Sequence, residues 1–207
     1  QEQPVVLISI EGLFQGGSLG EVGGAKIAGA LELAVEDNLK GIPTAAILLL
    51  ETGGVRLQEA NLGLAAIAEI QAAIVNLRQY QPVIAVVAGS VGCFGGMSIA
   101  AGLCSYIVMT QEGRLGLNGP QVIEQEAGIQ EYNAKDRPFI WSITGGNQRF
   151  TSGLADAYVD DDRQKIRQQV IDYLTQGVPH QHRSSNYTFY LEKLQQVDTT
   201  EQITPAQ

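Results

Sequence analysis

The stretch VIAVVAGSVGCFGGMSIAAGLC, residues 83–104, decides the fold because it joins a strand, a turn and a helix in one run. Its apolar start, Val83–Gly89, predicts a buried strand, SVGCFGG predicts a tight turn, and Gly96–Cys104 predicts a short helix of small residues. The stretch AAILLLETGGVRLQEANLGL, residues 45–64, has the same order of strand, Gly-Gly turn and helix. Repetition of such units predicts an α/β chain with mostly parallel strands.

Further strands and helices are expected on both sides of these two units. Ser18 and Glu21 stand in the S-x-x-E capping arrangement, so a helix should begin near Leu19. The expected strands are Pro4–Ile10, predicted to be buried, Ala45–Leu50, Tyr106–Thr110, Arg114–Asn118 and Ala155–Val159, and the expected helices are Leu19–Leu39, Leu57–Tyr80, Pro120–Ala127, Asp160–Gln176 and Tyr187–Val197.

The first two long helices each carry an apolar face. Such a face packs either into the core of its own chain or against a partner subunit, and core packing is the commoner outcome. The residues spaced by three or four positions are Ile27, Leu31 and Ala34 on the first helix and Leu64, Ile67, Ile70, Ile74 and Leu77 on the second.

The length of 207 residues suits one domain with a core of useful size. We expect residues 1–177 to form this domain and residues 178–207 to form a polar C-terminal extension with one helix. The first residue is Gln1 rather than Met, and a strand-like segment follows almost at once. We therefore expect that an N-terminal part of the natural chain is missing from this sequence.

Charge and residue types argue against several kinds of protein. The net charge of −9 disfavours nucleic-acid binding, because phosphate binding needs a basic surface. Cys93 and Cys104 form no CxxC pair and no histidine lies at ligand spacing from them, so we expect no metal site and two buried thiols. No apolar run approaches the ~20 residues that a membrane span needs. With no signal-peptide pattern, these features predict a cytoplasmic protein.

The two glycine pairs are the features that best suit chemistry. Gly53 and Gly54, and Gly95 and Gly96, each link a buried strand to the start of a helix. Helix N-termini carry unpaired N–H groups, and glycine lets a ligand approach them closely. Two such entrances side by side would form an oxyanion hole. Each pair alone is better explained by a tight turn or by close packing of helix and strand, and only the two pairs together favour a site. The P-loop and GxGxxG patterns are absent, and Ser90 and Ser98 have no histidine nearby in the sequence, which favours backbone amides over a nucleophile.

Four ordered segments carry a resemblance to the carboxyltransferase branch of the crotonase superfamily. They are FQGGSLGEVGGAK (residues 14–26), ETGGVRLQEA (51–60), GCFGGMSIAAG (92–102) and GLNGPQVIEQ (116–125), and the likeness covers most of residues 5–160. It implies a single-domain crotonase-like spiral of β-β-α units. Within that branch the chain is similar to β subunits of biotin-independent malonate decarboxylases.

The resemblance implies a lyase that acts on a malonyl thioester. In such enzymes an acyl-carrier subunit holds the malonyl group on a CoA-like phosphoribosyl-dephospho-CoA arm, and decarboxylation leaves an acetyl thioester. The expected partners are a crotonase-like γ subunit, the acyl-carrier subunit and an acyl-transferase α subunit, with the active site at the β–γ contact. The chain has no biotinyl-lysine motif and lacks the four-cysteine zinc ribbon of bacterial acetyl-CoA carboxyltransferase β subunits.

The resemblance also implies which residues form the site. The amides of the two glycine pairs would stabilise the enolate that decarboxylation produces. The substrate-binding candidates are Phe14, Gly16 and Gly17, which would line the acyl-arm tunnel or form a plain loop, Arg56, which would hold a phosphate or carboxylate or pair with Glu59, and Asn118 and Gly119, which would face the ligand or form a capping turn.

Three other functions remain open. A subunit that transfers CO₂ between a thioester and biotin would share the fold and the amide sites. A hydratase or isomerase would use Glu51, the carboxylate beside Gly53 and Gly54, for proton transfer. A non-catalytic scaffold would only hold a crotonase-like partner. Decarboxylation in the presence of avidin, the effect of Glu51→Gln and the effect of replacing a site glycine separate these functions.

Overall fold

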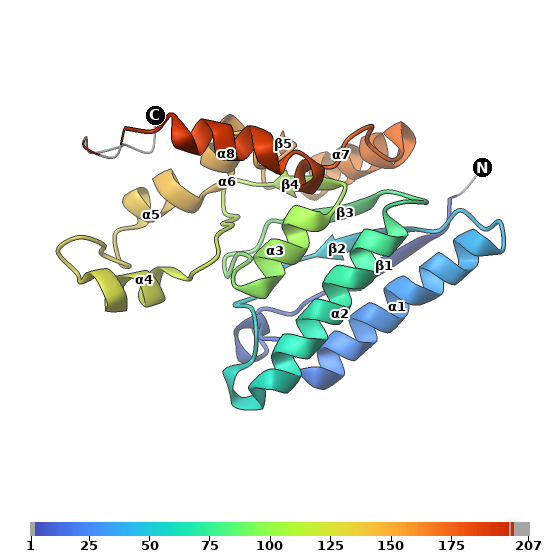
Figure 1. The fold of residues 1–207 in the computed structure, drawn as a ribbon, viewed down its shortest axis with the longest axis horizontal. Helices are drawn as coiled ribbons and strands as arrows, with labels where there is room; N and C mark the ends of the chain where they lie inside the picture. Colours follow the sequence, from blue (N-terminus) through green and yellow to red (C-terminus); the bar gives the residue numbers. More distant parts are fainter. Residues whose placement is uncertain (1–2, 199, 201–207) are drawn as a thin grey trace.

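The computed structural model describes residues 3–198 and residue 200. Five strands form one sheet in which each strand pairs with the next in the chain, and all four pairings are parallel. Figure 1 shows this order running across the molecule. The strands are β1 (Val5–Ser9), β2 (Ala45–Leu49), β3 (Val83–Val87), β4 (Tyr106–Met109) and β5 (Ala157–Tyr158). The predicted α/β fold with parallel strands is confirmed.

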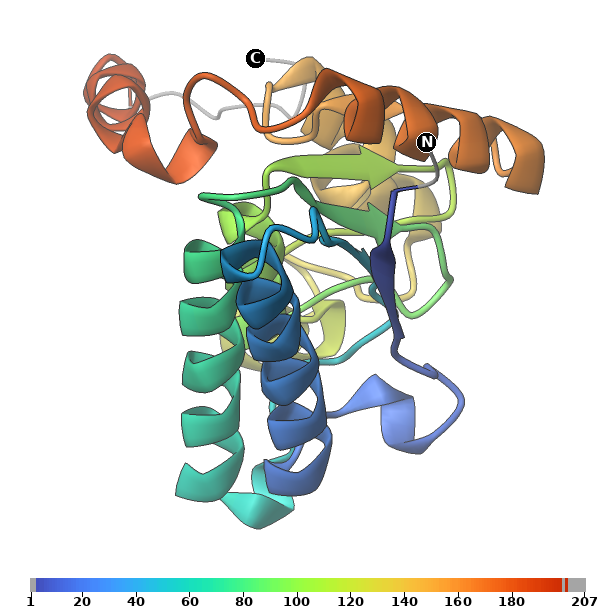
Figure 2. The ribbon, with the colours of Figure 1, turned by 90° about the vertical axis from the view of Figure 1, so that its right-hand side faces the viewer.

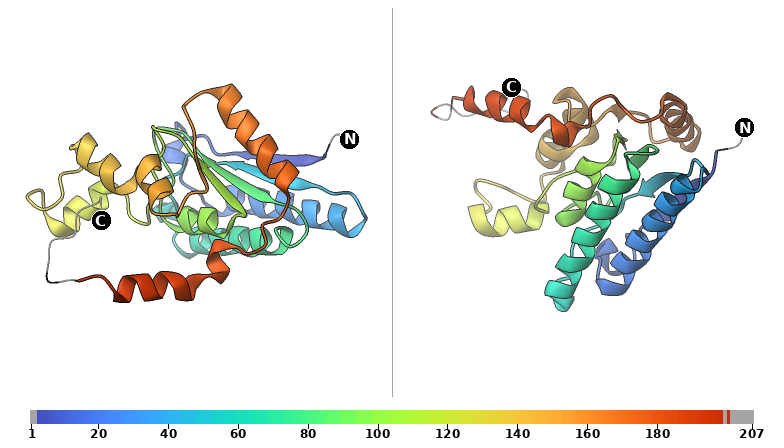
Figure 3. Two further views of the ribbon diagram at one scale, coloured as in Figure 1. Left: turned by 90° about the horizontal axis from the view of Figure 1, so that it is seen from above. Right: turned by 45° about the vertical axis from the view of Figure 1, so that its right-hand side comes forward.

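Helices cover both faces of the sheet. Figures 1 and 2 show α1, α2 and α3 on one face, and Figure 3 shows α7 crossing the other. The larger core lies between the sheet and the first group, and a smaller core lies under α7. The helices are α1 (Glu21–Leu39), α2 (Asn61–Leu77), α3 (Gly96–Leu103), α4 (Pro120–Ala127), α5 (Arg137–Thr144), α6 (Gly146–Thr151), α7 (Arg163–Gln176) and α8 (Tyr187–Gln195), with short 3-10 helices η1 (Gln15–Gly17), η2 (Leu57–Glu59) and η3 (Arg183–Ser185).

A second set of extended residues follows the strands and forms single bridges instead of a full sheet. Thr52 bridges Cys93, and Cys93 bridges Leu115. Leu19 bridges Val55 in the same way. These bridges lie between each main strand and the next helix, where a β-β-α unit has its second strand. They tie together the turns that leave the sheet.

The strand expected at Arg114–Asn118 is wrong. The segment makes only single bridges, from Leu115 to Cys93 and from Arg114 to Gly145. Its carbonyl groups instead accept hydrogen bonds from the turn after β3, because Cys93 N donates to Arg114 O at 2.8 Å and Gly95 N donates to Leu117 O at 2.7 Å. The prediction of extended residues here is correct, but this segment forms its hydrogen bonds with a turn instead of with a neighbouring strand.

The capping box expected at Ser18 and Glu21 is also wrong. Helix α1 begins at Glu21, and its N-cap residue Gly20 provides no side-chain cap. The carboxylate of Glu59 accepts the hydrogen bond from Glu21 N at 2.6 Å, and the Ser18 hydroxyl accepts one from Arg56 Nε at 3.3 Å. A residue that lies 38 positions away therefore replaces the expected local cap.

The long helix expected at Leu57–Tyr80 is interrupted near its start. The 3-10 helix η2 ends at Glu59, and the φ of 45° at Ala60 breaks the helix before α2 begins at Asn61. Leu64 is 58% exposed, which contradicts its expected place on the apolar face. The other residues of that face are buried, as are the three on α1, so the predicted core packing is confirmed for Ile67, Ile70, Ile74, Leu77, Ile27, Leu31 and Ala34.

The remaining differences lie at the edges of the fold. Strand β1 is an edge strand and is only partly covered, with Leu7 63% exposed, so the expectation of a buried strand there is wrong. Helix α7 begins three residues later than expected, at Arg163. Helices α5 and α6 were not predicted, although the Asp136 side chain caps α5 by accepting from Phe139 N at 3.1 Å. That Asp and the following Pro138 are a recognisable helix start.

The cysteines are buried free thiols, as predicted. Burial raises the pKa of Cys104 to about 12 and raises the pKa of Cys93 as well. Within residues 3–198 and 200, no three His, Cys, Asp or Glu side chains gather where they would hold a metal ion. In the same residues, no helix combines the length and the apolar character needed to cross a membrane.

Candidate functional site

Four segments that lie far apart in the sequence meet where the strands end. Gly53 N donates to Gly16 O at 2.8 Å, which joins the η1 loop to the turn after β2. Phe94 N donates to Thr52 O at 3.0 Å, which joins that turn to the turn after β3. The bond from Gly95 N to Leu117 O adds the loop before α4. Main-chain hydrogen bonds therefore order the four glycine-rich segments in one row at the carboxyl ends of the strands, where α/β proteins bind ligands.

The two Gly-Gly turns touch at Gly54 and Gly95. Both residues have positive φ, 103° for Gly54 and 61° for Gly95. A Cβ on Gly54 would lie 2.9 Å from Phe94 O and 3.1 Å from the Cα of Gly95. A Cβ on Gly95 would lie 3.2 Å from the Cα of Gly54. Any side chain at either position would push the turns apart, so the glycines are required for this contact.

Three of the four predicted amide donors already have acceptors. Gly53 N donates to Gly16 O, Gly54 N to Thr52 Oγ1 at 3.0 Å, and Gly95 N to Leu117 O. Across the described part of the chain, Gly96 N finds no acceptor. Gly96 is the first residue of α3, so this N–H belongs to the positive end of a helix. In this conformation only Gly96 among the four offers its hydrogen.

A second free amide lies beside the contact between the turns. Val55 N has no acceptor among the residues described, and it lies 3.8 Å from the position of a Cβ on Gly95. Leu19 pairs with the other edge of this segment, since Leu19 N donates to Gly54 O and Arg56 N donates to Leu19 O. Sequence reasoning missed Val55 because a valine amide leaves no signature in a sequence.

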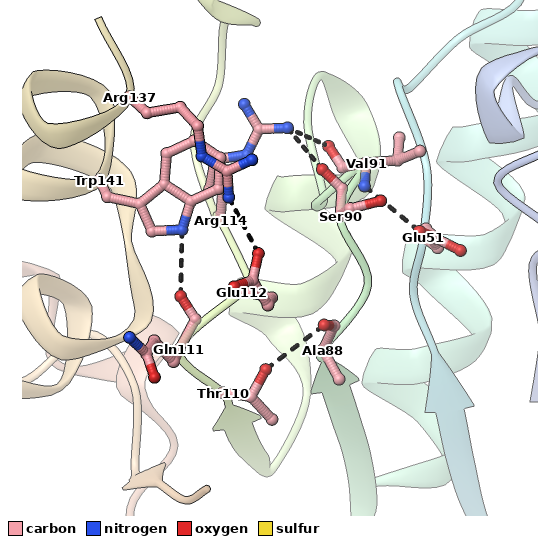
Figure 4. A network of polar contacts seen from close by, with 10 residues as sticks. All are labelled: Glu51, Ala88, Ser90, Val91, Thr110, Gln111, Glu112, Arg114, Arg137 and Trp141. Carbon is pink, nitrogen blue, oxygen red and sulfur yellow. Dashed lines mark hydrogen bonds and ion pairs between the residues drawn. The ribbon is translucent and has the colours of Figure 1, made fainter. Parts of the chain in front are cut away.

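Arg114 supports the turn after β3 from outside. Its Nη2 donates to Ser90 O at 2.6 Å and to Val91 O at 3.2 Å, as Figure 4 shows. The guanidinium lies between two rings, with its Cζ 5.5 Å from the centroid of Phe94 and 4.4 Å from that of Trp141. Burial, and then the nearby Arg137, lower the pKa of Arg114. The expected strand at this segment concealed the role of Arg114 in sequence reasoning.

Glu51 supports the same turn from the other side. Its Oε1 accepts from Val91 N at 3.2 Å (Figure 4). Two glycines leave room for the carboxylate, because a Cβ on Gly89 would lie 2.3 Å from Glu51 Oε1 and one on Gly12 would lie 2.6 Å from its Cδ. Glu51 and Arg163 also line a mainly apolar cavity of about 460 Å³ between the sheet and α7.

The substrate-binding candidates separate into two places. Phe14 and Gly17 line a cavity of about 580 Å³ between β1, the η1 loop and α1, together with Arg56 and Lys26. Gly16 is exposed at the same loop, and its carbonyl accepts from Gly53. The structure thus brings these candidates together beside the first glycine turn.

Arg56 connects the η1 loop to the start of α2. Its Nη2 donates to Ser18 O at 2.9 Å, and its Nη1 pairs with Glu59 Oε1 at 2.9 Å. The pairing with Glu59 that the sequence allowed is therefore present. The hydrogen bond from Glu21 N, followed by Arg56, lowers the pKa of Glu59.

Asn118 and Gly119 lie at the far end of the row. Gly119 is the N-cap residue of α4, and its carbonyl accepts from Val122 N at 3.0 Å, so the capping turn that the sequence allowed is present. Asn118 is exposed. Neither residue lines the 460 Å³ or the 580 Å³ cavity, and neither do the four glycines of the two turns.

The family and the relatives that this chain matches are all carboxyl transferases. Residues 3–207 match the carboxyl transferase domain family. The malonyl-S-ACP:biotin-protein carboxyltransferase of Malonomonas rubra is 41% identical over 177 residues, which cover 81% of this chain and 56% of that protein. The methylmalonyl-CoA carboxyltransferase 12S subunit of Propionibacterium freudenreichii subsp. shermanii is 33% identical over 126 residues, or 61% of this chain and 23% of that one. The chain therefore spans less than two thirds of either relative.

Solved structures are also similar. The hetero-tetramer of a Pseudomonas malonate decarboxylase in complex with malonate contains a chain that is 70% identical, with a TM-score of 0.96 over 99% of this chain and 74% of that chain. The Pseudomonas malonate decarboxylase MdcD–MdcE hetero-dimer contains one that is 68% identical, with a TM-score of 0.86 over 93% and 80% of the two chains.

Proposed function

The chain belongs to the carboxyl transferase domain family, and from that premise we propose that it is a β-type subunit of a malonate decarboxylase that removes CO₂ from a malonyl thioester. Its fold is crotonase-like, as the four motifs predicted. One observation carries the proposal within this chain. The N–H of Gly96 is free at the start of α3, beside the contact between Gly54 and Gly95.

The free amides suit the charge that the reaction creates. Loss of CO₂ from a malonyl thioester leaves an enolate, so negative charge grows on the thioester oxygen. Gly96 N–H and Val55 N–H donate hydrogen bonds to that oxygen, and the positive end of α3 adds to the attraction. Donors fixed in advance stabilise the transition state more than the substrate, and one of them is commonly worth about 2.7–4 kcal/mol.

The cavity beside the η1 loop, which Phe14 and Gly17 line, suits a long thioester arm. A CoA-like arm on a carrier subunit supplies the thioester when it is bound. The 580 Å³ cavity has the volume typical of small-molecule sites, which is about 300–1,000 Å³. Phe14 and Gly17 offer it an apolar wall, while Lys26 and Arg56 offer positive charge to its phosphates.

A partner subunit completes the site in this proposal. Val55 and Gly96 line neither the 460 Å³ cavity nor the 580 Å³ cavity. Another wall is therefore needed to exclude water from these two amides. Exposed leucines surround the row of turns, with Leu13 93%, Leu57 80% and Leu117 60% exposed. We assign this wall to a crotonase-like γ subunit, with an acyl-carrier subunit and an acyl-transferase α subunit as the other partners.

An assay on the assembled complex tests this function. With the malonyl thioester on the carrier subunit, CO₂ release and acetyl thioester formation are expected both with and without avidin. The second candidate is carboxyl transfer to biotin, which the 41% identity to the Malonomonas carboxyltransferase favours. Avidin sequesters biotin, so an activity that avidin abolishes would select this second candidate.

Replacing Glu51 by glutamine is expected to leave kcat close to the wild-type value. The amide oxygen of glutamine accepts from Val91 N as Glu51 Oε1 does, so the turn keeps its support. Proton transfer by Glu51 would give the opposite result, because losing a general acid or base costs about 10²–10⁴-fold in rate. Steady-state kinetics with a melting-temperature control decides between them. A large loss of kcat in a stable variant would favour hydratase- or isomerase-type chemistry.

A further inference from the structure

Two arginines bind the last carbonyl groups of α3, the helix whose first amide is Gly96. Arg78 Nη1 donates to Leu103 O at 2.5 Å. Arg183 Nη1 donates to Gly102 O at 3.4 Å and to Cys104 O at 3.3 Å. The last carbonyls of a helix lack partners within the helix and carry its negative end. Guanidinium groups therefore satisfy three successive carbonyls at this end of α3.

Arg78 is placed for this contact and for little else. It follows the end of α2 and is 8% exposed, and burial lowers its pKa. Its second acceptor is the Ser184 hydroxyl, at 3.0 Å. Among the described residues, no carboxylate forms an ion pair with it. A buried charge needs compensation, and the carbonyl end of α3 is the negative group that it meets.

Arg183 connects this end of α3 to the sheet. Its Nη2 forms an ion pair with Asp156, and the two side chains are 13% and 32% exposed. Asp156 Oδ2 also accepts from Ile107 N of β4 at 2.6 Å. The chain is also attached to β4 just before the C-terminal extension, at Gly177, whose carbonyl accepts from the Tyr106 hydroxyl at 2.9 Å. Figure 1 shows this part of the chain returning over α3 and β4.

Helix α3 is short enough for one end to control the other. Its eight residues span about 12 Å at 1.5 Å per residue. Met97, Ala100 and Ala101 are buried along it, in the same core as residues of the sheet and of α2, so we treat it as one rigid unit. A tilt that moves the carbonyl end moves Gly96 by a similar amount. A displacement of 1 Å in an active site costs on the order of 10²-fold in rate.

We propose that Arg78 and Arg183 are positioning residues, which hold the Gly96 amide in place by fixing α3 at its carbonyl end. The catalytic part of this proposal rests on the proposed function. It also makes residues 178–186 part of the apparatus that orients the site, because Arg183 and Ser184 belong to that segment.

The test compares three versions of the chain in the assembled enzyme. Arg183→Met combined with Asp156→Asn removes the contacts without leaving a carboxylate unpaired, and the asparagine still accepts from Ile107 N. Arg183→Lys keeps the charge and part of the hydrogen bonding. Val35→Ala, in the core under α1, is the control for general loss of stability.

In the double variant, kcat is expected to fall about 10–100-fold while KM changes much less, because the enolate forms only after binding. Arg183→Lys should recover most of kcat. Val35→Ala should keep the wild-type kcat even where its melting temperature falls as much as that of the double variant. Wild-type kcat in the double variant, or an equal fall in Val35→Ala, would overturn the proposal.

Amide hydrogen exchange separates this proposal from the proposed function. Exchange of the α3 amides, residues 97–103, is expected to speed up in the double variant and not in Val35→Ala. This measurement needs no turnover, so it tests whether Arg183 fixes the carbonyl end of α3 even if the wild-type complex releases no CO₂. Unchanged exchange in the double variant would overturn the proposed fixing of α3, whatever the activity of the complex.

Discussion

Gly96→Pro is expected to lower kcat for malonyl-thioester decarboxylation by about 10²–10³-fold, the loss typical of removing one oxyanion donor. Proline has no N–H, so the variant deletes the amide that has no acceptor among the described residues. The first position of a helix tolerates proline well, and Gly96 holds that position in α3. Gly95 before it has φ of 61° and ψ of −146°, which lies outside the α region that a following proline disfavours.

Gly96→Ala is the matched control for this change. A Cβ at position 96 would lie 2.7 Å from Cγ2 of Ile67, and both variants carry that Cβ. Alanine keeps the N–H, so the two variants share the contact of the Cβ with Ile67, and the proline variant differs by its missing donor and its ring carbons. Steady-state kinetics of the assembled enzyme, with melting temperatures for both variants, measures the difference.

Equal kcat in the proline and alanine variants would contradict the assignment of Gly96. If both also matched the wild type, the chain would be a scaffold for an active partner. A fall in both variants, with lowered melting temperatures, would assign the effect to packing against Ile67. Loss in the proline variant alone identifies the amide hydrogen as the functional group.

The second large effect is on stability. Gly17→Ala is expected to cost about 1–3 kcal/mol of unfolding free energy more than Gly16→Ala, the range of an overpacked core. Both glycines have nearly the same positive φ, 66° and 65°, so Gly16→Ala is the control for placing a side chain at a positive φ. A Cβ on Gly17 would lie 2.0 Å from Glu51 O and 2.8 Å from the Cα of Thr52, whereas one on Gly16 would meet open space.

Urea unfolding of the two variants measures this difference directly. Gly16→Ala sets the cost of backbone strain, so the surplus in Gly17→Ala reports the contact between the η1 loop and the turn after β2. The same displacement should reach Gly53 and Val55, so kcat should fall more for Gly17→Ala. Equal unfolding free energies would mean that the loop does not press on this turn in solution.

The sequence predicted the units of the fold and missed contacts between distant residues. Strands β2, β3 and β4 and helix α3 follow from apolar runs and glycine turns, because those signals are local. The cap of α1 comes from Glu59, and the partner of the segment after Arg114 is the turn at Cys93. Such pairings depend on the arrangement of units in space, which a local pattern does not contain.

The same distinction applies to the site. The glycines were found because close backbone contact demands them, and the structure does place Gly54 against Gly95. Which amides remain free depends on acceptors elsewhere in the chain, such as Gly16 O and Leu117 O. Among the described residues the free amides at this contact are those of Gly96 and Val55, and these two are the donors that we propose.

The order of the strands has a consequence for biosynthesis. Each strand pairs with its predecessor in the chain, so every unit leaving the ribosome finds its docking edge already made. The glycine turns at positions 53–54 and 95–96 can thus meet during translation. Arg183 emerges some eighty residues after α3, so the helix receives its final fixing only after that later segment has been made. In a nascent chain the amides of the site would therefore come together well before Arg183 fixes the helix that carries Gly96.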